Sequence, residues 1–155
     1  MGTLAAMLAQ SQESKINLNM KLLSFISSLF GKAKTTSQDI LQIQKEGAEI
    51  AIERAKLYNF ILNYSENSIK YLDKVLTIIG KEYAITKEKK DIEGFSIIFG
   101  LYIIEVIERN HEKGYLKRKL LGVEHDVFPY HWKGNLIFPC AWVQNIILDY
   151  NAKDI

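Results

Sequence analysis

The sequence predicts a mostly helical α+β domain, and three features of the chain carry that prediction. Apolar residues recur at three- and four-residue spacing across 38–63, as in an amphipathic helix. The run FSIIFGLYIIEVI, at 95–107, is apolar on nearly every side, which is typical of a central buried helix. The aromatic segment VFPYHW, followed by Lys133-Gly134-Asn135, favours a short strand and a tight turn. We therefore expect an antiparallel helix pair, a central buried helix, a small C-terminal antiparallel β-hairpin or sheet, and a final helix.

The main domain is expected at 38–155, preceded by a separate N-terminal segment. A chain of 155 residues suits one domain that is large enough to bury a core. Residues 1–19 lack the basic and apolar regions of a signal peptide, and Met20 offers a natural second start. We interpret 1–19 as a leader or an expression-derived extension.

Residues 20–34 predict a short amphipathic helix. Leu22, Ile26 and Leu29 share one side of it, and serines take the other side. Such a helix would dock on its own domain or on a partner. The alternative is a membrane-associated adaptor that contacts a lipid surface through 20–34, but a serine face is weakly charged for that role.

Three further helices are expected before the strands. A polar break supplies N-cap residues for the first, which should span 38–63. Ser65 offers a fresh cap for a second helix ending at Gly80, and so short a connection favours an antiparallel pair. A charged linker at 81–91 should lead into the central helix at 91–110.

The stretch FPYHWKGNLIFPCAW contains the pattern FP-x-x-W twice, and the two copies favour different structures. Pro129 indicates an edge or irregular position in a strand. Pro139 can open a helix at its first turn, where a missing N–H costs nothing. Two or three short antiparallel strands are expected beyond Gly114, and helical spacing returns at 141–150.

Composition argues against several classes of function. The 20 basic and 18 acidic residues leave a net charge of +2, which is too balanced for the concentrated basic face of a nucleic-acid-binding protein. The longest apolar run is interrupted by Glu105 and is shorter than the roughly 20 residues of a membrane span. Cys140 is the single cysteine, so an internal disulfide is excluded, and a reducing compartment such as the cytoplasm is favoured.

A small enzyme would have to draw on few residues. Glu105 lies in the most apolar helix, where a desolvated carboxyl could serve as an acid or base together with His125 or His131. The favoured interpretation is structural, because Arg109 lies four residues later and can pair with Glu105 on the same helix face.

Metal and thiol chemistry have weak support in the sequence. His111, His125, His131 and Cys140 are suitable zinc ligands, but their spacing matches no compact zinc site. We expect neither a metal nor another cofactor. Cys140 follows Pro139 at the expected start of a helix, where a thiol can be activated, yet a lone cysteine among apolar residues is more often a packing residue.

Several short segments resemble a family of small bacterial domains. YSENSIKYLDKVL (64–76), FGLYIIEVIER (99–109) and IFP before a last helix are similar to its "ys-x-eS-x-x-x-LD", "fG-x-Y-x-GE-v" and "fP-x-x-v-x-k-r" patterns, over roughly 40–148. Ile104 replaces the usual small residue before the glutamate, and Val143-Gln144-Asn145 lacks the basic ending. Compact domains of this sort often stand beside bacterial toxins. The resemblance therefore implies a non-catalytic immunity protein that neutralises a cognate toxin by binding it and covering its active site.

The C-terminal hairpin is the surface we expect to bind that partner. Aromatic side chains at an exposed turn bury a large area at low entropic cost. The alternative is that the hairpin tryptophan packs on the central helix and the turn is inert. The residues assigned to partner binding are Tyr130, His131, Trp132, Lys133 and Asn135.

Overall fold

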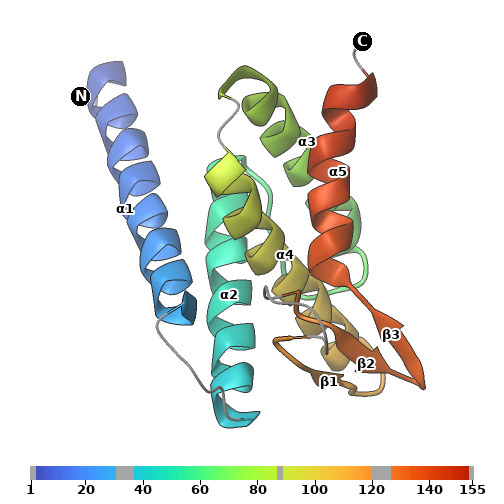
Figure 1. Ribbon diagram of the computed structural model, residues 1–155. Helices are drawn as coiled ribbons and strands as arrows, with labels where there is room; N and C mark the ends of the chain where they lie inside the picture. The colour runs from blue at the N-terminus through green and yellow to red at the C-terminus, as the bar shows by residue number, and fades with distance from the viewer. Residues whose placement is uncertain (1–2, 31–36, 87–88, 120–126, 154–155) are drawn as a thin grey trace.

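The computed structural model describes residues 3–30, 37–86, 89–119 and 127–153, and it has the mostly helical α+β architecture that the sequence predicts (Figure 1). The described residues form helices and one small antiparallel sheet, whose strand order is β1-β2-β3. The elements are α1 (Leu4–Phe30), α2 (Ser37–Leu57), α3 (Ser68–Thr86), α4 (Lys89–Asn110), β1 (Tyr115–Leu116), β2 (Tyr130–Trp132), β3 (Asn135–Ile137) and α5 (Pro139–Lys153).

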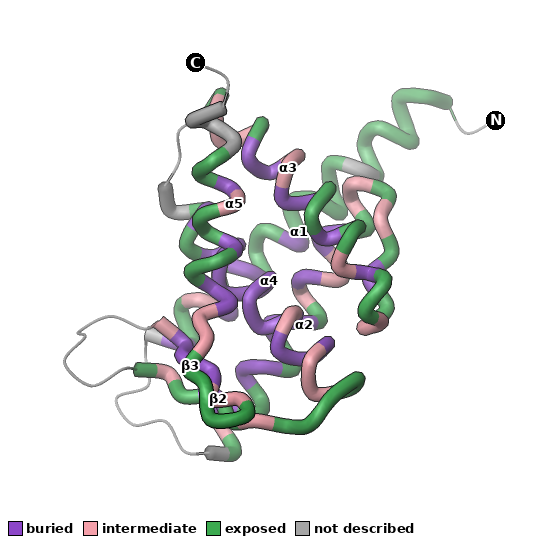
Figure 2. The backbone as a smooth tube through the Cα atoms, turned by 90° about the vertical axis from the view of Figure 1, so that its right-hand side faces the viewer, coloured by how far each residue is buried: buried purple, intermediate pink, exposed green. Residues whose placement is uncertain are grey.

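Helix α4 is the central element, as the apolar run at 95–107 predicts. It packs against α2 on one side and α5 on the other, while α1 covers α2 and α3 covers α5 (Figure 1). Both α2 and α5 run antiparallel to α4. Buried residues gather along α4 and on the faces turned toward it (Figure 2). Phe99, Leu101, Tyr102 and Ile104 are fully enclosed, because neighbours cover α4 on several sides.

The expected pairing of the second and third helices is corrected by the structure. Helix α2 ends at Leu57, six residues earlier than predicted, and α3 continues past Gly80 to Thr86. Asn59 (φ 65°) and Tyr64 (φ 66°) adopt left-handed backbone conformations in the connection at 58–67. The connection thereby directs α3 away from α2, so that α2 pairs with α4 and α3 packs on α5. The larger apolar surface of α4 offers α2 more area to bury than α3 does.

The N-terminal helix is longer than predicted. Helix α1 begins at Leu4, so Met20 lies within a continuous helix and marks no structural boundary. Leu18, Leu22, Phe25 and Leu29 recur at helical spacing and are all buried. This row packs on α2, and the residues of 20–34 that are described therefore dock on their own chain. Residues 31–34 lie outside the described part of the chain.

The hairpin forms where the sequence predicts it. Strands β2 and β3 are joined by Lys133 (φ 49°) and Gly134 (φ 75°), and two positive φ values in a two-residue loop define a type I′ turn. Pro129 immediately precedes β2, and its carbonyl accepts the Lys117 N–H at 3.0 Å. Phe128 before it has a φ of 47°, which confirms the irregular position expected for this proline.

Helices α4 and α5 approach most closely at Gly100. A Cβ atom at this position would lie 2.7 Å from the Cα of Cys140 and 2.8 Å from its backbone nitrogen, so only glycine fits. Pro139 is the first residue of α5, as its missing N–H predicts. The pair of Gly100 and Cys140 therefore sets the distance between the two helices.

We predict that Gly100→Ala lowers the free energy of unfolding by about 1–3 kcal/mol, because the added methyl group must push the α5 backbone away. Urea denaturation followed by circular dichroism measures this change. Gly94→Ala is the matched control on the same helix, since its Cβ would meet Leu22 only at ordinary contact distance, 3.5 Å. The control should be neutral or stabilising by about 0.5–1 kcal/mol. Equal stability of both variants would contradict the close-approach argument.

Candidate functional site

Tyr130 belongs to the core, so its assignment to a partner-binding surface is corrected. Its side chain is fully buried, and its hydroxyl accepts the Gly114 N–H at 2.8 Å and donates to Glu108 Oε1 at 3.3 Å. Burial raises the pKa of Tyr130 to about 12. Alternate residues of a strand point to opposite faces, and Tyr130 is on the face that covers α4.

Trp132 is half-buried and anchored at the end of α4. Its Nε1–H donates to the backbone carbonyl of Glu112 at 2.8 Å, and its ring meets His111 edge-on with centroids 6.1 Å apart. The Lys133 amino group lies 4.6 Å from the centre of the indole ring. The structure thus supports the alternative in which this tryptophan packs on the central helix.

The rest of the predicted surface remains accessible. His131 is half-buried and stacks on Tyr115, with ring centroids 4.6 Å apart and an interplanar angle of 5°. Lys133 and Asn135 are exposed at the turn. Of the five predicted contact residues, the turn therefore presents Lys133 and Asn135 fully, and His131 and Trp132 in part.

Trp142 is the exposed tryptophan of this region. Its side chain is 46% exposed and lies at the edge of a groove of about 600 Å³, which we call the Trp142 groove. The groove is lined mainly by apolar side chains: Ile69 from α3, Ile103 and Ile107 from α4, Leu136 from β3, and Trp142 itself from α5. Concave, mostly apolar surfaces of this size are common at binding sites.

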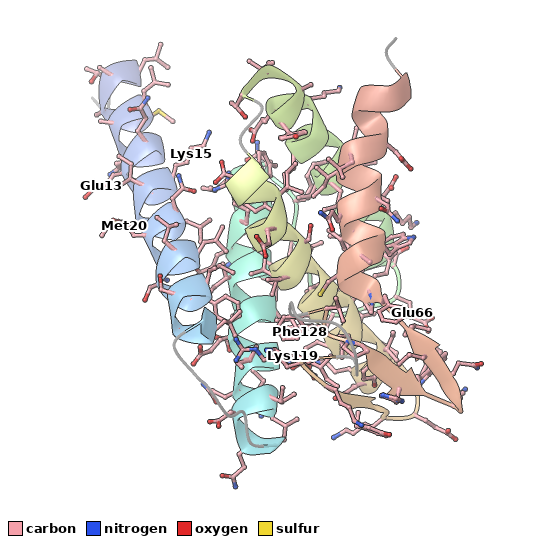
Figure 3. All side chains as sticks on the ribbon, in the orientation of Figure 1. Glu13, Lys15, Met20, Glu66, Lys119 and Phe128 are labelled. Carbon is pink, nitrogen blue, oxygen red and sulfur yellow. The ribbon has the colours of Figure 1, made fainter. Side chains whose placement is uncertain are left out.

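A contact between two polar side chains borders the groove. His111 Nε2 contacts Glu66 Oε1, which joins the end of α4 to the segment before α3. Figure 3 shows Glu66 beside the lower end of α5, next to the sheet. Both side chains line the groove and supply its polar rim. A groove with an apolar floor and a polar rim is suited to bind an apolar side chain of a partner that is surrounded by polar residues.

The sequence pattern did not reveal this groove, because two apolar rows compete on α5. By sequence spacing Trp142, Ile146 and Tyr150 form one row, whereas the buried row is Cys140, Val143 and Ile147. Trp142 lies one position before Val143, so its side chain lies beside the buried row and does not belong to it. An aromatic residue next to a complete apolar row is the signal that could have indicated its exposure.

Glu105 has the structural role favoured from its sequence. Its Oε2 accepts a hydrogen bond from Arg109 Nε at 3.3 Å, and the Arg109 guanidinium lies 3.5 Å from the centre of the Tyr64 ring. His131 belongs to a different cluster with Tyr115. His125 lies outside the described residues. The contacts among described residues therefore offer no shared pocket for Glu105 and His131.

The segments that carry the family resemblance meet at the hydroxyl of Tyr102. This buried hydroxyl accepts the Tyr64 N–H at 3.0 Å and is hydrogen-bonded to Ser68 Oγ at 2.6 Å. Ser65 caps the start of α3, as predicted, by accepting the Ser68 N–H at 3.2 Å. The contacts of Tyr64 and Ser68 with Tyr102 thus hold the 58–67 connection against α4.

Cys140 is a packing residue. It is 6% exposed, its Sγ faces the Ile97 carbonyl at 3.8 Å, and burial raises its pKa to about 12. A thiol in this state is a poor nucleophile. Within the described residues, no three His, Cys, Asp or Glu side chains gather in an arrangement that could hold a metal ion.

Comparison with known protein families, with curated proteins and with solved structures found no match to this chain. None of the helices in the described residues combines the length and apolar character needed to cross a bilayer.

We predict that Cys140 resists thiol reagents in the native protein. With a pKa of about 12, about one thiol in ten thousand is ionised at pH 8, and the sulfur is enclosed. Native protein should react with Ellman's reagent only on the timescale of unfolding, whereas guanidinium-unfolded protein should react within minutes. Fast stoichiometric labelling of the native state would contradict the packing role.

We also predict that Tyr102→Phe destabilises the fold by about 1–3 kcal/mol, because the Tyr64 N–H loses its acceptor at a largely enclosed position. Chemical denaturation measures the loss, and amide exchange should accelerate first at Tyr64. Tyr71→Phe, on a side chain that is 38% exposed, is the control and should be nearly neutral. Unchanged stability of the Tyr102 variant would show that the hydroxyl does not hold the connection.

Proposed function

We propose that the protein is a non-catalytic binding protein, an immunity protein that neutralises a cognate bacterial toxin in the cytoplasm by binding it and covering its active site. The observation that carries this proposal is the exposed Trp142 beside its apolar groove. Exposed tryptophans at the centre of an apolar surface are frequent energetic anchors of protein interfaces. The resemblance of the helical segments to toxin-neighbouring domains supplies the class of partner.

The charge on the sheet beside the groove supports a partner with an acidic surface. Exposed lysines flank the sheet, and those in the described residues are Lys113, Lys117, Lys119 and Lys133. Strands β1, β2 and β3 carry no Asp or Glu. None of these four lysines lines the Trp142 groove, whose acidic lining residue is Glu66, so they would steer an acidic partner to the sheet beside the groove.

The proposed contact combines two neighbouring features. An apolar side chain of the toxin would enter the Trp142 groove, and acidic residues around that side chain would face the hairpin turn with Lys133 and Asn135. Trp132 supports this surface from beneath, through its bond to the Glu112 carbonyl. The predicted partner-binding turn is therefore kept in the proposal beside the groove, while Trp142 takes the place of the hairpin tryptophan, Trp132, as the aromatic anchor.

The test is a binding measurement with the protein encoded by the adjacent gene. We expect a one-to-one complex that abolishes the toxicity of that protein when both are expressed together. Trp142→Ala should weaken the complex by at least about 2 kcal/mol, roughly thirtyfold in Kd, because the anchor is lost. Isothermal titration calorimetry gives the affinity, and thermal melting confirms that the variant is folded.

Leu23→Ala is the matched control, since Leu23 is 65% exposed on α1, away from the groove. It should bind like the unmodified protein. Lys133→Glu should slow association and reduce the salt dependence of the rate, if an acidic surface is recognised. Undiminished affinity of the Trp142 variant would overturn the assignment of the surface, and a lack of any complex or protection would overturn the proposed function.

A further inference from the structure

A second candidate site surrounds Arg54, at the end of the molecule away from the sheet. Arg54 lies on α2 and is 5% exposed. Its terminal nitrogens donate to Asn19 Oδ1 at 2.6 Å and to the Tyr58 hydroxyl at 3.3 Å, and its guanidinium lies 4.8 Å from the centre of the Phe95 ring. The buried Nε has no hydrogen-bond partner. Among the described residues, no carboxylate lies within ion-pairing distance of this cation.

This arrangement is energetically unusual. A buried guanidinium normally pairs with a carboxylate, because removing its charge from water is costly. Neutral acceptors and aromatic rings compensate part of that cost here. An N–H left without a partner adds to the cost. A buried donor of this kind sets Arg54 apart from the other buried polar side chains of the described residues, and the charged cavity beside it is the candidate ligand site.

Arg54 lines a cavity of about 190 Å³ between α1, α2, α3 and α4. Lys15 reaches this region from α1, and Figure 3 shows its side chain directed toward the rest of the molecule, whereas Glu13 points away. Glu82 from α3 and Asp91 from the first turn of α4 line the same cavity. Two cations and two carboxylates therefore share one small space.

On the acidic side of the cavity, Glu82 is linked to Arg54 through the Tyr58 hydroxyl. Tyr58 accepts from Arg54 and donates to Glu82 Oε2 at 3.0 Å, so one hydroxyl links the two charges. Burial raises the pKa of Tyr58 to about 12, so the hydroxyl keeps its proton at neutral pH and can donate it. Asp91 lines the same cavity from the first turn of α4, where a carboxylate is favoured by the helix N-terminus.

We propose that this cavity binds a small amino acid or a similar amino-carboxylate. The carboxylate would face Arg54 and Lys15, and the ammonium group would face Asp91 and Glu82. A ligand with both charges matches the lining, whereas phosphate would approach two carboxylates and a simple amine would approach two cations. Since a water molecule occupies about 30 Å³, the volume holds about six waters, which restricts the ligand to a few carbon atoms.

Isothermal titration calorimetry with glycine, β-alanine and γ-aminobutyrate tests the proposal on the full chain. At least one of them should bind saturably at one site. Acetate, methylammonium and phosphate, at the same concentrations, should bind at least tenfold more weakly. Lys15→Gln changes an exposed side chain and should weaken the amino-carboxylate severalfold without affecting folding.

Arg54→Lys should weaken binding at least tenfold, because lysine lacks the planar fork that Asn19 and Tyr58 hold in place beside the cavity. Since Arg54 is buried, Asp91→Asn serves as a second variant that keeps the size of the side chain and should lose affinity through the ammonium group. Heat-denaturation curves establish that each variant is folded. The site is overturned if no amino-carboxylate binds, if acetate or phosphate binds as tightly, or if the folded Lys15 and Asp91 variants both bind like the unmodified protein.

Discussion

The need to enclose α4 determines most of this structure. A helix that is apolar on nearly every side must be covered by several neighbours, because a single partner buries one face only. Helices α2 and α5 take opposite sides, and α1 and α3 cover those helices in turn. Gly100 allows α5 to approach to backbone contact at Cys140, and the Tyr102 hydroxyl fixes the connection that leads from α2 to α3. Each of these contacts helps to cover the apolar surface of α4.

The Trp142 groove is where this enclosure is incomplete. Ile103 and Ile107 stand one turn apart on α4 and are only half-buried, between the start of α3 and the sheet. Trp142 covers their edge without filling the space, and the Glu66–His111 pair borders the groove. An apolar floor that the chain leaves uncovered is unfavourable in water and becomes favourable once a partner occupies it. This imbalance supports the proposed binding role of the groove.

Buried polar groups differ between the two ends of the molecule in whether all of them have hydrogen-bond partners. Tyr102 and Tyr130 both have hydrogen-bond partners, and each ties a connection to α4. Arg54 has partners for its terminal nitrogens but none for Nε. Among the described residues the other large buried polar side chains are paired, and this exception lies next to a charged cavity that Phe95 and Ile92 also line. The contrast separates a structural network at one end of α4 from a candidate ligand site at the other.

Local sequence alone determined the central helix, the cap at Ser65, the turn at Lys133-Gly134 and the start of α5 at Pro139. Apolar spacing, φ preference and a missing N–H act within a few residues, so these features can be predicted from the chain. The tertiary structure alone decided that α2 pairs with α4, that Tyr130 and Trp132 serve the fold while Trp142 is exposed, and that Arg54 shares a cavity with Lys15 and Asp91. Periodicity shows which face of an element is apolar. It does not show which neighbour covers that face, because the neighbour comes from a distant part of the chain.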